Sequence, residues 1–391
     1  MRPGPGPVRP TLERMSQPDA PEPAASPSEP APADAAVRLR GTLDALPSYV
    51  PGRPAADDGV ERYKVSSNES PFPPLPSVQE AVTRALAGAN RYPDMAAAAL
   101  REALGREHGV APEQIAVSTG SVAVSGDLVR ALVDQGDEVV FAWRSFEAYP
   151  IVVTSHGGVP VMVPLAEGHR HDLPAMAAAI TDRTRLVVLC TPNNPTGPAL
   201  GTDEVRAFLR SVPDHVVVAI DEAYREFHDP ETVLDSGAIF REHGNVVLLR
   251  TFSKMQALAG LRIGYAVAHP RLARALGQVT VPFGASLLAQ EAALATLEPA
   301  AREQLEQRAA QIRAERDRVR AGLASQGWDL PEAQGNFVYL PLGERSAEFA
   351  AFADARGLVV RAYGVDGVRV TIAEVAANDR LLEIAREWIG R

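Results

Sequence analysis

The chain has 391 residues, and at about 150 residues per domain this length predicts two or at most three domains with a large buried core. Hydrophobic residues make up 46% and charged residues 23%, but no apolar run reaches the roughly 18 to 20 residues of a membrane-spanning helix, so we expect no membrane partner. A formal net charge of -10 would repel a phosphate backbone, so we expect no nucleic-acid partner either.

The N-terminal segment 1–36 is expected to be a disordered tail rich in proline and alanine. It lacks the apolar core of a secretory signal and carries acidic residues, which transit peptides avoid. Ten of the 33 prolines lie before residue 33, a composition that buries too little apolar surface to offset the entropy lost on ordering.

From residue 37 onward, short β-branched runs alternate with helical patterns, which predicts an α/β fold with parallel strands joined by crossover helices. The predicted strands are Ile115–Ser118, Glu138–Phe141, Val159–Val163, Leu186–Cys190, Val216–Ile220, Val246–Leu249 and Gly264–Val267. Several of these runs are apolar throughout, which is typical of strands covered on both faces of a doubly wound sheet. Helices are predicted at Val78–Ala87, Val122–Leu132 and Asp203–Ser211.

A long charged helix follows the last of these strands and is expected to end near Gly327. Its apolar face consists of Leu305, Ile312, Val319 and Leu323. The stripe is short for a coiled coil, so a helix bridging two domains is the preferred interpretation. Strands within Asn336–Leu342 and Gly357–Thr371, and a closing helix to Trp388, complete the predicted elements.

The sequence predicts no metal site. Cys190 is the only cysteine, which excludes an intrachain disulfide and a cysteine-rich metal site and favours a reducing cytoplasm. The one close histidine pair, His169 and His171, has no further ligands nearby in the sequence.

A candidate anion-binding turn, Thr119-Gly120-Ser121-Val122, follows the first predicted strand of the sheet and opens a helix. The free N–H groups of that helix end and the Ser121 hydroxyl can converge on one anion, although such a turn is also an ordinary helix cap. The dinucleotide and nucleotide signatures G-x-G-x-x-G and G-x-x-x-x-G-K-[ST] are missing from the sequence.

Polar residues also follow three later strands, at the sheet edge where open α/β folds place their sites. The turn Thr191–Gly197 can hold Asn194 rigidly through its two prolines and its glycine. Asp221 follows an all-apolar strand, so it needs a cationic or hydrogen-bonding partner, and a structural salt bridge would satisfy the same need. Ser253-Lys254, with Arg262 eight residues later, combines a nucleophilic amine with a second anion binder.

These motifs, taken in order, resemble one family of enzymes. They are Ser67-Asn68-Glu69, Arg91-Tyr92-Pro93-Asp94, Pro192-Asn193-Asn194-Pro195-Thr196-Gly197, Asp221-Glu222-Ala223-Tyr224, Ser253-Lys254 and Gly260-Leu261-Arg262-Ile263-Gly264. The series is similar to the fold-type I pyridoxal-phosphate aminotransferases, in the branch of the histidinol-phosphate and aromatic enzymes, from about Leu39 to Trp388. The resemblance implies a large cofactor-binding domain at 67–285, with a mostly parallel doubly wound sheet, and a smaller α/β domain formed by 37–66 and 286–391.

The resemblance implies that the cofactor is pyridoxal 5'-phosphate and assigns its contacts. Lys254 would carry it covalently and move the substrate proton, while Asp221 would keep the ring nitrogen protonated. The other expected contacts are Asn194 and Tyr224 at the ring hydroxyl, Phe146 on the ring face, and Gly120, Ser121, Val122, Ser253 and Arg262 at the phosphate. Tyr92 would reach the phosphate from a second subunit, which implies a homodimer.

For the substrate, Arg369 matches the arginine that grips the α-carboxylate, a bidentate task that suits a guanidinium. Arg361 lies where related enzymes place a second anion contact, and Asn336 and Tyr49 are candidate pocket residues. The chain departs from the family pattern at Ser70 and at Met255-Gln256-Ala257, which affects substrate preference more than reaction type.

The segments Trp143–Glu147 and Leu46–Arg53 resemble the aromatic sub-branch most, which implies transamination between an aromatic L-amino acid and a 2-oxo acid such as 2-oxoglutarate. Histidinol-phosphate transamination is the alternative. A catalytically silent relative and a lyase or decarboxylase on the same fold are weaker alternatives, because the residues expected at the cofactor are intact.

Overall fold

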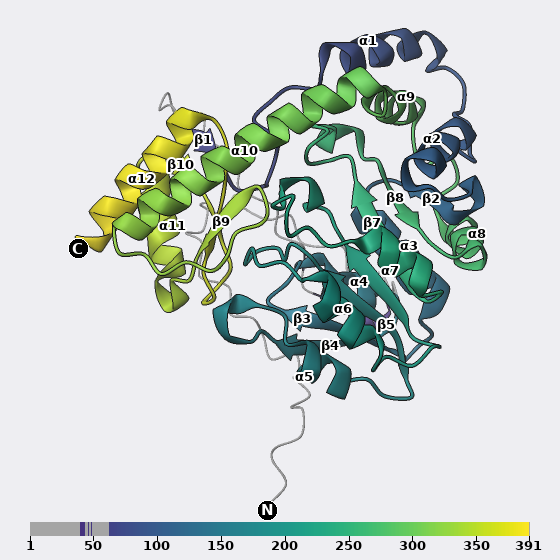
Figure 1. Ribbon diagram of the computed structural model, residues 1–391, viewed down its shortest axis with the longest axis horizontal. Coiled ribbons are helices and arrows are strands. Elements are labelled where there is room, and N and C mark those ends of the chain that lie inside the picture. The colour runs from purple at the N-terminus through teal and green to yellow at the C-terminus, as the bar shows by residue number, and fades with distance from the viewer. Residues whose placement is uncertain (1–39, 44–45, 47, 49–61, 391) are drawn as a thin grey trace, which may run out of the picture.

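The computed structural model describes residues 40–43, 46, 48 and 62–390, shown in Figure 1. The predicted tail 1–36 and the candidate pocket residue Tyr49 lie outside these residues. Within them, no helix combines the length and the apolar character needed to cross a membrane.

A seven-stranded sheet forms the centre of the larger part. Its strands are β2 (Ile115–Ser118), β3 (Glu138–Trp143), β4 (Val159–Pro164), β5 (Thr184–Cys190), β6 (Val217–Asp221), β7 (Val246–Thr251) and β8 (Gly264–Val267). They lie in the order β2-β8-β7-β6-β5-β3-β4, and only β8 runs antiparallel to its neighbours. Every strand predicted for this sheet is present, which confirms the mostly parallel α/β fold.

Helices cover both faces of this sheet, which explains why its strands are apolar at successive positions. One face packs on α3 (Ser121–Leu132), α4 (Ala148–Ser155) and α8 (Pro270–Val279). The other face packs on α1 (Pro76–Ala85), α2 (Ala98–His108), α5 (Leu173–Ala178), α6 (Thr202–Leu209), α7 (Ser236–Glu242) and α9 (Leu287–Thr296). Val139, Val140 and Phe141, consecutive residues of β3, are therefore all fully buried.

A second, smaller core surrounds a three-stranded antiparallel sheet in the order β11-β12-β9. Its elements are β9 (Phe337–Leu340), α11 (Ser346–Asp354), β10 (Leu358–Val359), β11 (Arg361–Ala362), β12 (Val368–Thr371) and α12 (Val375–Ile389). The first strand, β1 (Tyr63–Lys64), pairs in parallel with β10, so a segment early in the described chain joins the smaller core. The strands predicted within Gly357–Thr371 are three short ones: Val360 separates β10 from β11, and the chain turns between β11 and β12, where Gly364 has φ +55°.

The long helix α10 (Pro299–Ser325) links the two cores, as Figure 1 shows. Ala301 and Leu305 near its start belong to the core of the large sheet, whereas Ile312, Val319 and Leu323 belong to the smaller core. The predicted bridging helix is present, while the domain limits at residues 66 and 285 stay a prediction. Short 3-10 helices occupy Gly41–Leu43, Leu86–Gly88, Pro112–Gln114, Glu167–His169, Arg225–Phe227, Ala259–Leu261 and Gly343–Arg345.

Candidate active site

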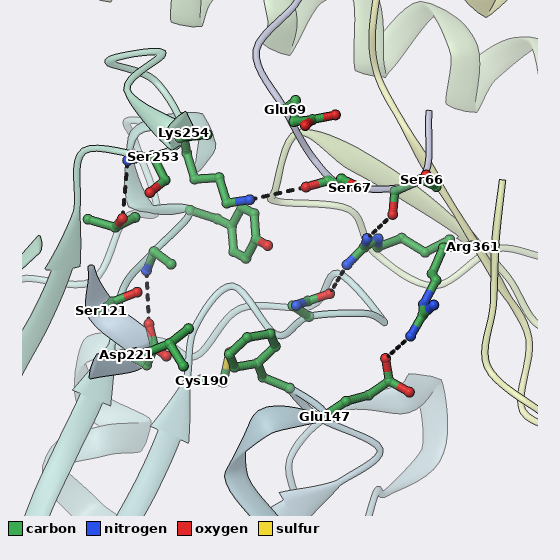
Figure 2. A pocket seen from close by; sticks show the side chains of 18 of the residues that line it. Ser66, Ser67, Glu69, Ser121, Glu147, Cys190, Asp221, Ser253, Lys254 and Arg361 are labelled. Atoms are coloured by element: carbon green, nitrogen blue, oxygen red, sulfur yellow. Dashed lines mark hydrogen bonds and ion pairs between the residues drawn. The ribbon is translucent and has the colours of Figure 1, made fainter. Parts of the chain in front are cut away.

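A cavity lies where the carboxyl ends of the parallel strands meet the smaller sheet (Figure 2). Cys190 and Asp221, at the ends of β5 and β6, line it together with Lys254, which follows β7. Arg369 of β12 lines it from the other side. The structure thus brings together polar residues that the sequence placed at separate strand ends.

Lys254 extends across this cavity. Its Nζ donates hydrogen bonds to the backbone oxygens of Ser67 (3.3 Å) and Asn68 (3.1 Å). Burial lowers the pKa of Lys254 to about 7, and the positive charges of Arg369 and Arg262 act in the same direction. A large fraction of this amine is therefore neutral near pH 7, which a nucleophile or general base requires.

The reactivity of Lys254 in cofactor-free protein is expected to rise with a midpoint near pH 7, because only the neutral amine reacts with an acylating reagent. The chain contains two lysines, Lys64 and Lys254, so acetylation measured by mass spectrometry separates them cleanly. Labelling of Lys254 should reach its plateau by about pH 8. Reactivity that continues to rise with pH beyond 9 would contradict the lowered pKa.

Asp221 is buried at the end of β6 and contacts two neutral donors. The Tyr149 hydroxyl donates to its Oδ2 at 2.7 Å, and the Ala223 N–H donates to its Oδ1 at 3.2 Å. Burial raises the pKa of Asp221 above its ordinary value despite these hydrogen bonds. A cation placed against this carboxyl would favour its ionised form and would offset its desolvation.

The predicted anion-binding turn is assembled at the start of α3, where Gly120 has φ +97°. The Arg262 guanidinium lies against this turn and donates to the Ser253 hydroxyl (3.3 Å) and to the Thr119 backbone oxygen (3.4 Å). The positive φ strains any residue with a side chain, and a Cβ at position 120 would also lie 2.5 Å from an Arg262 nitrogen, so glycine is favoured there. Ser121 at the helix start also lines the cavity.

Arg369 is buried on β12 and touches both halves of the cavity. Its Nη1 donates to the Asn194 side-chain oxygen (2.5 Å) and its Nη2 to the Ser66 backbone oxygen (2.6 Å). Its Nε is buried with no hydrogen-bond partner among the described residues. Tyr224 lies close by and accepts a hydrogen bond from the Asn68 side chain (3.1 Å), and burial raises the pKa of its hydroxyl.

Arg361 of β11 lies directly opposite Arg369 in the antiparallel pair of strands. Its Nη2 donates to the Glu147 carboxylate at 2.6 Å, and both residues line the cavity. A second ion pair, Arg144 with Asp366 at 2.5 Å, joins the same two segments. The segment after β3 is thereby held against β11 and the turn that follows it.

Phe146, Ser121 and Val122 line the cavity, whereas two other predicted site residues that the structure describes, Asn336 and Tyr92, do not. Asn336 is fully buried behind it and donates to the Asn68 backbone oxygen (3.3 Å), so it can support Asn68 but does not reach the cavity. Tyr92 is 82% exposed and packs on Phe283, with ring centroids 4.7 Å apart. Tyr49 lies outside the described residues.

Sequence reasoning missed the side chains that act through long-range contacts. Tyr149 lies in an apolar helical run whose pattern is typical of a core residue. Its hydrogen-bond partner Asp221 is 72 residues away in the sequence. Asn68 has φ +52° and accepts a hydrogen bond from the Thr371 hydroxyl (2.9 Å). Ser70, a departure from the family pattern, accepts a local hydrogen bond from the Phe72 N–H.

Comparisons with known proteins place this geometry in context. Residues 61–384 match the family model for aminotransferase class I and II. A relative named aromatic amino acid aminotransferase, from Streptomyces coelicolor, is 51% identical to this chain, and the match covers 90% of this chain and 97% of the relative. Another of the same name, from Thermobifida fusca, is 48% identical, and the match covers 90% of this chain and 98% of the relative.

Solved structures agree with these matches. The histidinol-phosphate aminotransferase from Sinorhizobium meliloti, in complex with pyridoxal-5'-phosphate, has a TM-score of 0.80 at 30% identity and covers 90% of this chain and 98% of its own. The aspartate aminotransferase from Thermus thermophilus with maleate has a TM-score of 0.75 at 27% identity, with 89% and 99% covered. Sequence motifs, fold and cavity therefore agree, and the chain belongs to the class I and II aminotransferases.

Proposed function

We propose that this chain is a pyridoxal 5'-phosphate-dependent enzyme that transfers the amino group of an aromatic L-amino acid to a 2-oxo acid such as 2-oxoglutarate. The observation that carries the proposal is the convergence of Lys254, Asp221, Arg262 and Arg369 on one cavity. The aromatic substrate is supported by the relatives named aromatic amino acid aminotransferase, which are about half identical to this chain along nearly their whole length.

The residues of the cavity fit the cofactor. Arg262, Ser253 and the start of α3 at Ser121 form a cup for its phosphate, which a Cβ at Gly120 would fill. Asp221 is a buried carboxyl whose contacts are neutral, and it would pair with the protonated ring nitrogen. Asn194 and Tyr224 would bind the ring oxygen, and Phe146 would lie on the ring face.

When bound, pyridoxal 5'-phosphate supplies an electron sink that stabilises negative charge at the substrate α-carbon. Lys254 would hold the cofactor covalently and then take the α-proton on its Nζ, which its lowered pKa permits. Asp221 would keep a proton on the ring nitrogen. Arg369 would orient the α-carboxylate, since its Nε is a donor still without a partner among the described residues.

Relative rates with two donors test the substrate. Binding of an aromatic ring is stabilised mainly by the apolar area that it buries, at roughly 25 cal/mol per Å2. A phosphate needs charge-assisted hydrogen bonds, and the donors that make them would stay unpaired if an uncharged group were bound instead. We expect a higher kcat/KM for phenylalanine or tyrosine than for histidinol phosphate in steady-state assays. Turnover of histidinol phosphate at least about tenfold more efficient than any aromatic donor would favour the alternative function instead.

The homodimer and the cytoplasmic location belong to the same proposal. Tyr92, Met95, Val281 and Phe283 are exposed apolar residues, and the last three line a surface cavity. Such a patch suits contact with a second subunit, from which Tyr92 would reach the phosphate cup. The cytoplasmic location rests on the chain's single, buried cysteine.

A further inference from the structure

The ion pair between Glu147 and Arg361 forms part of the cavity wall on which the substrate would bind. The side chain of Glu147 is 24% exposed and that of Arg361 is 11% exposed, and their nitrogen and oxygen atoms are 2.6 Å apart. Figure 2 shows the two side chains at one edge of the pocket, joined by a dashed line; Arg361 belongs to β11 and Glu147 follows β3. A partly buried pair of this kind largely cancels its own charge toward a ligand.

The other cations on the cavity wall already have tasks in the proposed function. Arg262 belongs to the phosphate cup, Lys254 to the reacting centre and Arg369 to the α-carboxylate. Arg361 stands opposite Arg369 on the neighbouring strand, and side chains at opposite positions point to the same face of the sheet. An anion that is bound by Arg369 and is larger than a carboxylate would therefore meet Arg361 next.

A carboxylate carries one charge, which Arg369 alone can balance. A phosphate ester attached in its place carries up to two charges and extends further, so it would call on Arg361 as well. There it would meet the Glu147 carboxylate, and like charges held close together in a partly desolvated site repel each other. Displacing Glu147 from Arg361 would leave that carboxylate without its partner, which is also unfavourable.

We propose that Glu147 determines the class of amino donor by neutralising Arg361, so that the cavity accepts α-carboxylates and disfavours donors with a phosphate ester in that place. The inference rests on the proposed function and deepens it. It assigns to one carboxylate the choice between amino acids and amino-alcohol phosphates, a choice that the apolar part of the pocket cannot make, because both kinds of donor can carry the same ring.

The test compares wild-type holoenzyme with Glu147→Gln, which keeps the size of the side chain and removes its charge. The probes are 3-phenylpropionate and 3-phenylpropyl phosphate, which share the ring and do not react because they lack an amino group. Calorimetric Kd values are expected to shift by about tenfold or more toward the phosphate in the variant. The kcat/KM ratio of phenylalaninol phosphate to phenylalanine should shift in the same direction.

Asp366→Asn is the matched control, because it breaks the neighbouring ion pair between the same two segments, and neither Arg144 nor Asp366 lines the cavity. We expect it to leave the ratio of the two Kd values unchanged. An equal shift in both variants would show that loosening of these segments is the cause and would overturn the proposal.

The double variant Glu147→Gln with Arg361→Gln should lose the gain in phosphate binding, and persistence of that gain would overturn the role of Arg361. An unchanged Kd ratio in Glu147→Gln, in an enzyme that does transaminate phenylalanine, would overturn this inference alone. Failure of the wild-type enzyme to transaminate aromatic donors would overturn the proposed function, and the two unreactive probes would still report on Glu147.

Discussion

Replacing Lys254 with alanine is expected to reduce transamination by at least about 10²- to 10⁴-fold, the usual contribution of a positioned general base. The loss should be larger still if the covalent link also speeds the transfer of the cofactor from the lysine amine to the substrate amine. The structural reason is that Lys254 is the only amine on the cavity wall among the described residues. Rates with a saturating aromatic donor provide the measurement.

The covalent link itself gives a second readout of this variant. Borohydride reduction of the cofactor-loaded enzyme should attach the cofactor permanently to Lys254, and the variant should bind cofactor through the phosphate cup without a reducible bond. Lys64, the other lysine of the chain, pairs with Glu69 at 2.7 Å and does not line the cavity, so Lys64→Ala is the control. Cofactor found on Lys64 after reduction would show that the proposed site is wrong.

Replacing Asp221 with alanine is expected to lower kcat, because the transition state should lose stabilisation on the order of several kcal/mol. Electrostatic effects of this size are among the largest in active sites. Removing the carboxylate leaves nothing to hold the ring nitrogen protonated, so negative charge at the α-carbon would be less well stabilised. Steady-state kinetics should place the loss in kcat more than in KM. An Asp221→Ala enzyme with near-normal turnover would exclude this role.

Two further variants separate charge from packing at this position. Asp221→Asn keeps the size of the side chain and can still accept from the Tyr149 hydroxyl, so it should lose most of the rate while the protein keeps its thermal stability. Tyr149→Phe removes the hydroxyl that donates to Asp221 but keeps the carboxylate, and it should have a smaller effect on kcat. A rate loss in Tyr149→Phe as large as that in Asp221→Ala would show that orientation of the carboxyl dominates over its charge.

The strands and the strand-end residues could be predicted from the sequence because the patterns that indicate them are local. A run such as Val139-Val140-Phe141 is apolar because helices cover both faces of the sheet, and polar residues such as Asp221 follow directly where such a run ends. Gly120 could be predicted for the same reason, since its turn directly follows a strand, whereas Arg262 lies in the short motif Gly260-Leu261-Arg262-Ile263-Gly264, which resembles a known family.

The contacts that complete the site could not be predicted from local sequence patterns. Asn336 carries no local sign that it supports Asn68 from behind, and Glu147 carries none that it meets Arg361, 214 residues away. Such pairings depend on how the two sheets face each other, which no periodicity encodes. Tyr149 illustrates the same limit, because a helical aromatic residue has the same local pattern whether it fills the core or binds a carboxyl group.

The contact of Arg369 with the Ser66 backbone spans 303 residues, and β1 pairs with β10 across nearly the same length of chain. During synthesis, the large sheet with Lys254, Asp221 and Arg262 emerges before β10 and β12 exist. The first described strand must therefore wait, unpaired, for almost the last one, and such distant pairings form slowly. The parts proposed to hold the cofactor can thus fold before the part proposed to bind the substrate. The last step of folding would then be the pairing of β1 with β10 and the contact of Arg369 with Ser66.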